Sequence, residues 1–236
     1  MTNNAIRTKA RYLLNGNYGR LAIYIIIFFL LKLLASLLPS TIFSDVSHPL
    51  LLVGQLILSF IFTAFVNMLN VGITCVSLRI CREKPFSLAD LFYAFRFNQD
   101  TFLTLELLFT IIPTILSIPS VFFSMIVANY DLSLVAYFGL SIGWSLLTTF
   151  ITTIILLRLK FAIYIVLDTP STKARTALKN AIQLTKGHTW QLVRLMCSFI
   201  GLYLLSIASI LTGFLFVKPY IETSFCAFYE SLIGNN

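Results

Sequence analysis

Charged side chains are scarce in this 236-residue chain, since only 11% of its residues are Asp, Glu, Lys or Arg. A soluble globular protein has roughly a quarter of its residues charged. Hydrophobic residues make up 58% of the chain, and its mean hydropathy is +0.90. This composition excludes a soluble globular domain, a disordered chain and a collagen-like chain. It predicts a protein embedded in a lipid bilayer.

Side chains that usually carry catalysis or bind metals are also few. The two histidines, His48 and His188, fall on opposite sides of the membrane in the predicted topology, so they form no metal-ligand pair. The four cysteines have no CxxC spacing, and the chain contains neither a phosphate-binding glycine loop nor a nucleophile elbow. We therefore expect a protein that is not an enzyme and that holds no cofactor and no metal.

Several apolar runs are long enough to cross a bilayer, which requires about 20 residues. The last run is too long for one crossing, because a straight helix from Trp190 to Val217 would measure about 42 Å. We therefore expect it to fold back near Thr212 and Gly213. The sequence thus predicts about six transmembrane helices, with five spans and an outer tail as the alternative. The predicted spans are 19–39, 50–78, 101–128, 132–160, 189–211 and 213–233.

Basic residues predict the orientation of these spans, because Lys and Arg stay on the cytoplasmic side of a membrane. Of the 17 Lys and Arg residues, only Lys32 and Lys218 lie outside three short segments. The connections 39–49 and 129–132 contain neither Lys nor Arg. The sequence therefore predicts a multi-pass protein with both termini in the cytoplasm and a first span that is retained. The three basic segments are residues 7–20, 79–96 and 158–194.

Each basic segment has the pattern of a short amphipathic helix that precedes a membrane hairpin. The second helix begins with Ser87 and Asp90 in the spacing of a capping box, and we expect Leu91 to lie on its lipid-facing side. Thr169 and Pro170 are typical of the start of the third helix. The predicted interfacial helices are 4–15, 87–97 and 170–186.

The first and third units match at a constant offset, which is 171 residues from Gly16 to Gly187. A module of one interfacial helix and one membrane hairpin, used three times, explains this match. The alternative is that any interfacial helix leading into a span needs Ala, Leu and Gly at such places. The matching residues are Ala10, Leu13, Gly16 and Leu21 in the first unit and Ala181, Leu184, Gly187 and Leu192 in the third.

The basic faces of these helices are expected to bind anionic lipid headgroups at the cytoplasmic face. Each Lys or Arg near the surface of an anionic membrane contributes about 1 kcal/mol to such binding. The headgroup candidates in the third unit are Arg175, Lys179, Lys186 and His188. The alternative is that these residues only anchor the helix and set the topology.

Ionisable side chains inside predicted spans are functional candidates, because their insertion costs roughly 2.5 to 3.5 kcal/mol. Lys32 and Glu106 lie in the first and third spans, and Lys218 and Glu222 lie four residues apart in the sixth, where they are expected to pair. Asn67 is expected to hydrogen-bond between helices. Either packing or a pathway for a substrate or proton explains such residues.

Small and helix-breaking residues mark two further places in the second hairpin. Pro113 and Pro119 interrupt the third span, and a broken membrane helix can line a cavity. A plain kink is the alternative, since the fourth span has no corresponding proline. Gly139 and Gly143 are four residues apart in that fourth span, and this spacing predicts close helix packing.

A set of short motifs lies at the two ends of the chain, namely Lys9-Ala10-Arg11, Leu14, Gly16-Asn17-Tyr18, Ala177-Leu178, Lys186-Gly187-His188, Trp190, Ser198-Phe199-Ile200-Gly201, Pro219-Tyr220, Thr223 and Ala227-Phe228-Tyr229. With these motifs the chain resembles an uncharacterised bacterial integral membrane protein family, domain of unknown function nine-seven-five (DUF975). This resemblance implies a multi-span protein of a bacterial cytoplasmic membrane, and it favours six spans. It supplies no active site. The chain departs from the family pattern at Thr185, where Met is common, and at Leu202, where Trp is common.

The sequence therefore predicts an all-α, polytopic, single-domain membrane protein over residues 1–236. Its expected role is binding lipids or assisting another membrane process, with membrane lipids and a membrane protein as partners. No nucleic acid is expected, because the basic charge follows the topology. One alternative is a small transporter or lipid flippase with a cavity near Pro113, Pro119, Lys32 and Glu106. Another is a partner or immunity-type subunit of a membrane complex.

Overall fold

The computed structural model describes residues 2–42, 49–128, 134–208 and 212–234, which are helical apart from short turns and connections. This confirms the predicted all-α class. The predicted outer connections, 39–49 and 129–132, lie largely outside the described residues. The elements are α1 (Asn3–Leu14), α2 (Tyr18–Ile42), α3 (Pro49–Cys81), the short 3-10 helix η1 (Leu88–Phe92), α4 (Tyr93–Arg96), α5 (Gln99–Ala128), α6 (Leu134–Leu159), α7 (Phe161–Asp168), α8 (Ala174–Leu184), α9 (Thr189–Cys197), α10 (Ile200–Ala208) and α11 (Thr212–Ile233).

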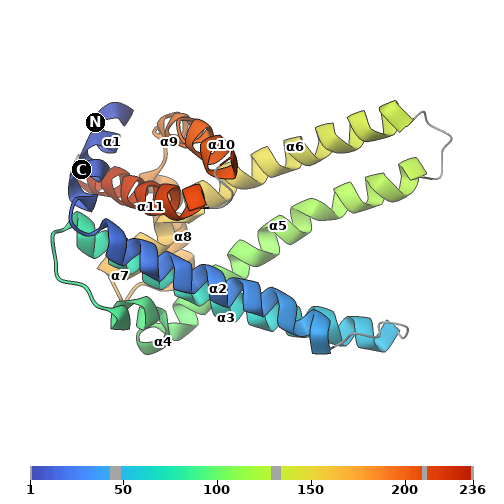
Figure 1. Ribbon diagram of the computed structural model, residues 1–236, viewed down its shortest axis with the longest axis horizontal. Helices are drawn as coiled ribbons and strands as arrows, with labels where there is room; N and C mark the ends of the chain where they lie inside the picture. The colour runs from blue at the N-terminus through green and yellow to red at the C-terminus, as the bar shows by residue number, and fades with distance from the viewer. Residues whose placement is uncertain (1, 43–48, 129–133, 209–211, 235–236) are drawn as a thin grey trace.

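Two long hairpins, α2–α3 and α5–α6, dominate the shape of the molecule. They meet near the end where both chain termini lie and diverge toward the other end (Figure 1). Among the described residues, four segments are long and apolar enough to cross a membrane, and they indicate a multi-pass membrane protein. The predicted fifth and sixth spans are not among them. The four segments are Tyr18–Pro39, Val53–Cys81, Gln99–Pro119 and Ile142–Asp168.

The predicted end of the fourth span at residue 160 lies one residue after the end of α6 at Leu159, but the apolar candidate segment continues to Asp168. The helical chain continues past Lys160 into α7, whose side chains from Phe161 to Tyr164 are buried. The sequence analysis assigned this stretch to a basic cytoplasmic segment because Arg158 and Lys160 precede it. The chain can remain apolar and packed there because the Lys160 ammonium is paired with Glu222.

The last two predicted spans form a more buried unit than expected, although α11 has nearly the bounds predicted for the sixth helix, 213–233. The predicted helix 189–211 is divided into α9 and α10 by a tight turn, in which the Phe199 N–H donates to the Met196 carbonyl oxygen at 3.0 Å. The helix α11 packs against α1, α2, α3 and α10, and its side chains are buried from Pro219 to Tyr229. It therefore forms a central helix of the bundle rather than a lipid-facing one (Figure 1).

The first and third units share a backbone feature that their sequence match anticipates. Gly16 and Gly187 both have φ of +85°, and each separates an amphipathic helix from the helix that follows it. Asn98, which precedes α5, also has a positive φ of +50°. Positive φ is readily adopted by Gly and tolerated by Asn. Buried side chains recur at the offset of the match: Ile6 and Ala177, Ala10 and Ala181, Leu21 and Leu192.

The predicted continuous helix over residues 87–97 is replaced by η1 and α4. The capping box is present, with the Ser87 N–H donating to Asp90 Oδ2 at 2.8 Å. The period of a 3-10 helix is three residues, and Leu91 and Ala94, three apart, are both fully buried. The expectation that Leu91 faces lipid is therefore wrong.

The third interfacial helix is shorter than the predicted range 170–186, since α8 begins at Ala174 and ends at Leu184. The Thr169 hydroxyl does not cap this helix. It donates back to the Ile165 carbonyl oxygen at 2.8 Å and lies 2.8 Å from the Thr172 hydroxyl. These contacts form a turn after α7, which delays the start of α8.

Candidate functional site

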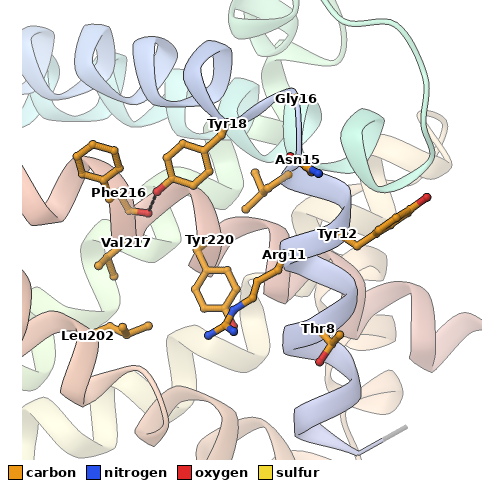
Figure 2. A pocket seen from close by; sticks show the side chains of 11 residues that line it. Thr8, Arg11, Tyr12, Asn15, Gly16, Tyr18, Leu202, Phe216, Val217 and Tyr220 are labelled. Carbon is orange, nitrogen blue, oxygen red and sulfur yellow. Dashed lines mark hydrogen bonds between the residues drawn. The ribbon is translucent and has the colours of Figure 1, made fainter.

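An open cavity of about 790 Å³ lies between α1, α10 and α11, beside the turn that joins α1 to α2 (Figure 2). Side chains from both ends of the chain meet in it. The Arg11 side chain extends from α1 toward the Tyr220 ring on α11, while Tyr12 points away from the cavity. We call this cavity the α1 groove. Its lining residues are Thr8, Arg11, Tyr12, Leu14, Asn15, Gly16, Tyr18, Leu202, Phe216, Val217 and Tyr220.

One end of the α1 groove carries positive charge that no carboxylate neutralises. The chain has no Asp or Glu before Asp45, so α1 is purely basic. Arg11 lines the groove, and its guanidinium lies 5.6 Å from the centroid of the Tyr220 ring. Arg7 is not a lining residue, but its Nε donates to the Tyr220 hydroxyl oxygen at 3.1 Å. Neither arginine forms an ion pair within the described part of the chain.

The other end of the α1 groove is apolar. Leu202 from α10 and Val217 from α11 form its wall, and Phe216 contributes an exposed ring. The Tyr18 ring stacks on Phe216 with a centroid distance of 5.9 Å, and its hydroxyl donates to the Phe216 carbonyl oxygen. A cavity with cations at one end and apolar side chains at the other suits an amphipathic anion.

The four predicted headgroup residues do not contribute to this groove. Arg175 and Lys179 lie exposed on α8, and Lys186 and His188 are exposed between α8 and α9. None of them lines any of the five main cavities of the described residues. The predicted headgroup residues lie in the third unit, whereas the α1 groove is lined by the interfacial helix of the first unit.

A buried charge cluster lies on the opposite side of α11. The predicted pairing of Lys218 with Glu222 is present, with Nζ 2.8 Å from Oε1. Lys160, which the sequence analysis did not single out, places its Nζ 2.7 Å from Oε2 of the same carboxylate. Glu222 is fully buried. The Lys160 ammonium also lies 5.0 Å from the centroid of the Phe225 ring.

Glu106 lies beside this cluster without joining it. The residue is only 3% exposed, and its Oε1 atom has no hydrogen-bond partner. Lys160 and Lys32 are the cations within electrostatic reach of its carboxyl group. Neither forms an ion pair with it. Lys32 itself is exposed on α2.

None of the five main cavities of the described residues brings Pro113, Pro119, Lys32 and Glu106 together. Both prolines lie inside α5, and only Pro113 lines a cavity, which measures about 230 Å³. Pro119 is exposed. Glu106 lies two turns before Pro113 and does not line this cavity. The small cavity is otherwise lined by hydroxyl groups from α5 and α6, namely Ser117, Thr148, Thr149, Thr152 and Thr153.

Three important side chains were missed by the sequence analysis as site residues: Arg7, Tyr220 and Lys160. Tyr220 belongs to the Pro219-Tyr220 motif of the family resemblance, but the resemblance assigns no role to it. The apolar run that follows Lys160 in the sequence could have indicated that this lysine precedes a buried helix. Nothing in the sequence indicates that Arg7 reaches a residue 213 positions away.

Comparison with known proteins gives a family and no described activity. None of the curated proteins matches the chain, and no solved structure matches it. Within the described residues, no group of three or more His, Cys, Asp or Glu could hold a metal ion. Five of the residues that suggested the family, Arg11, Leu14, Gly16, Tyr18 and Tyr220, line the α1 groove. The chain matches DUF975, described as a protein of unknown function, over residues 1–236, and it belongs to that family.

Proposed function

We propose that this protein is a non-enzymatic, multi-pass protein of the bacterial cytoplasmic membrane that binds a phospholipid with an anionic headgroup in the α1 groove. The headgroup lies at Arg7 and Arg11, and an acyl chain follows Leu202 and Val217. Both chain termini and the groove are on the cytoplasmic side. This orientation is supported by the concentration of basic residues in the three interfacial segments.

The observation that carries the proposal is the unpaired charge of Arg7 and Arg11 beside an apolar wall. An arginine near a phosphate forms charge-assisted hydrogen bonds, which are about twice as strong as neutral ones. Tyr220 holds both guanidinium groups in place through its hydroxyl and its ring. A headgroup that enters the groove therefore meets donors that are already positioned.

The position of α1 along the membrane normal supports a lipid rather than a soluble ligand. The helix is amphipathic, with Ile6 and Ala10 fully buried and Lys9 exposed, as expected for a helix that lies in the headgroup region. The span Tyr18–Pro39 starts within four residues of its end at Leu14. The groove is therefore at the level of lipid phosphates, and its apolar wall continues toward the acyl chains.

Native mass spectrometry of the full chain tests this proposal. The protein is placed in nanodiscs of phosphatidylcholine with a minor fraction of phosphatidylglycerol, and the lipid that remains bound after release is counted. Each arginine contributes about 1 kcal/mol, so the double variant Arg7→Gln/Arg11→Gln should bind phosphatidylglycerol roughly thirtyfold more weakly. The matched control is Arg175→Gln/Lys179→Gln, which removes equal charge from the exposed face of α8.

The control variant should retain the bound lipid, because its two side chains do not line the α1 groove. Equal loss of phosphatidylglycerol in both variants would show a general attraction to the basic surface and contradict the proposal. A co-purified protein in place of lipid would favour the alternative of an accessory subunit.

Transport is a second candidate function, and the small hydroxyl-lined cavity at Pro113 favours it. A transporter needs polar groups within the membrane region, and the α5–α6 hairpin supplies them at that cavity. Joint substitution of Thr149 and Thr152 by Val, at two residues that line this cavity, distinguishes the two functions. A transporter loses transport in proteoliposomes and remains folded, whereas a lipid-binding protein retains its bound phosphatidylglycerol.

A further inference from the structure

Glu106 combines deep burial with an incomplete set of hydrogen bonds. Its side chain lies two turns inside α5, and its Oε1 atom is left without a donor. A buried carboxylate with an unfilled acceptor is unfavourable unless a cation or a proton compensates it. The described residues provide no direct ion pair for this carboxyl group.

Two opposing effects act on the charge of Glu106. Burial favours the neutral carboxylic acid, whereas the nearby ammonium groups of Lys160 and Lys32 favour the carboxylate. With Glu106 ionised, Lys160, Lys218, Glu222 and Glu106 sum to zero charge. With Glu106 neutral, the same buried group has one excess positive charge. The ionised Glu106 has one carboxylate oxygen without a hydrogen-bond donor, and the neutral Glu106 leaves the cluster with one excess positive charge.

We propose that Glu106 is a proton-binding site inside the membrane domain. Its carboxylate takes one proton from water to become a carboxylic acid, and it releases the same proton as the cluster regains neutrality. The site is distinct from the α1 groove and does not depend on lipid binding. Lys160, whose ammonium is shared with Glu222, is the cation with the largest electrostatic effect on the Glu106 carboxyl group.

Polar groups continue from Glu106 along one face of α5. The Thr110 hydroxyl, one turn further along the helix, donates to the Glu106 carbonyl oxygen at 2.9 Å and accepts from the Asn67 amide at 3.4 Å. The next turn leads to Pro113 and the hydroxyl-lined cavity. Polar groups on this face of α5 thus extend from Glu106 toward the cavity, while Glu106 itself lines none of the five main cavities of the described residues.

Other ionisable groups on the helices packed against α5 have separate partners or lie at a surface. Arg79 pairs with Asp90, Arg158 donates to Thr185 and Ile182, and Asp168 pairs with Arg82. The remaining described groups on these elements are Cys75 and Cys81 on α3, Tyr93 and Arg96 on α4, Tyr164 on α7, and Arg175 and Lys179 on α8, of which Arg96, Arg175 and Lys179 are exposed. The cations that act electrostatically on the Glu106 carboxyl group are therefore Lys160 and Lys32, and burial is the larger effect.

Infrared difference spectroscopy of the full chain in dodecyl maltoside tests the site. This detergent has no ester groups, so the carboxylic acid C=O band can be followed as pH is raised. Exposed carboxylates are already ionised above about pH 6. We expect one further C=O band to disappear as the pH is raised above about 6 in the wild type. It should be absent from Glu106→Gln and retained in Asp100→Asn, an exposed change on the same helix.

A second variant reports on the neighbour of the site. Lys160→Gln removes a cation that favours the carboxylate, so the midpoint of the band should move to higher pH by about 1 to 3 units. If Glu106→Gln does not fold, Glu106→Asp replaces it, since a shorter carboxyl group must shift the same band. Identical titrations of wild type and Glu106→Gln, or no titrating band in the wild type, would overturn the proposal.

Discussion

Arg82 and Asp168 form a bidentate ion pair that joins the end of α3 to the end of α7. Nη1 of Arg82 lies 2.6 Å from Oδ1, and Nη2 lies 2.9 Å from Oδ2. The same guanidinium donates through Nε to Glu230 on α11 at 2.8 Å, and the Tyr229 hydroxyl donates to Asp168 at 2.9 Å. One arginine therefore connects all three helical hairpin units at the end of the molecule where the termini lie.

Arg82→Gln should lower the free energy of unfolding by about 2 kcal/mol, because it leaves two partly buried carboxylates without their shared donor. Reversible unfolding by SDS in mixed micelles measures this change. Arg79→Gln is the matched control, since Arg79 forms one ion pair, with Asp90, at a more exposed position. Its effect should stay below about 1 kcal/mol. Equal effects would show that the shared position of Arg82 adds nothing.

The stabilisation by Arg82 should also persist in alkaline solution. The hydrogen bond to Asp168 is the main cause that raises the pKa of Arg82 above its ordinary value; burial opposes it, and the bond to Glu230 supports it. A raised folded-state pKa gives stability that is lost only as the pH rises through that pKa, which is above about 12. The difference between wild type and Arg82→Gln should therefore be the same at about pH 7 and about pH 10, as SDS unfolding at both values will show.

Gly16→Ala should reduce stability by about 1 to 2 kcal/mol, although an added Cβ would meet no atom within 4 Å. The reason is the backbone, since φ at Gly16 is +85°. Gly19→Ala, three residues further into α2, is the control, because Gly19 is helical and equally open. Ala is the better helix former, so this variant should be neutral or more stable. Thermal unfolding of both variants in one detergent distinguishes the two cases.

Gly72→Ala should be the most damaging glycine substitution in the described chain. A Cβ at Gly72 would lie 1.9 Å from the carbonyl oxygen of Leu91, so η1 could not remain against α3. The expected loss is above about 4 kcal/mol, or failure to fold. Gly139→Ala on α6 meets nothing within 4 Å and should be tolerated. The monodisperse fraction in size-exclusion chromatography provides the measurement, and a normal yield of Gly72→Ala would contradict this packing.

A comparison of Gly72 with Gly139 and Gly143 also shows why some helix packing could not be predicted from the sequence. The spacing of Gly139 and Gly143 predicts close helix contact, yet an added Cβ would touch nothing at either residue. Gly72 has no such spacing and makes the closest approach. Contact between α3 and η1 depends on how the chain turns after Cys81, and local spacing contains no information about it.

Local charge patterns were more informative than long-range ones. The i,i+4 spacing of Lys218 and Glu222 predicts their pairing, and the structure confirms it. The second partner of Glu222 is Lys160, 62 residues earlier, so only the folded chain reveals that one carboxylate pairs with two lysines. Likewise, the basic face of α1 is evident from the sequence, but the groove requires α10 and α11 to lie against it.

Glu222→Gln should lower the free energy of unfolding by about 3 to 5 kcal/mol, because it leaves the ammonium groups of Lys160 and Lys218 without their carboxylate. Lys218→Met should cost less, since the pair of Lys160 with Glu222 remains. The double variant Lys218→Met/Glu222→Gln should be more stable than Glu222→Gln alone, because it removes one unpaired buried cation. SDS unfolding of the three variants completes this cycle. A double variant less stable than either single variant would show that packing by Lys218, rather than its charge, is what α11 requires.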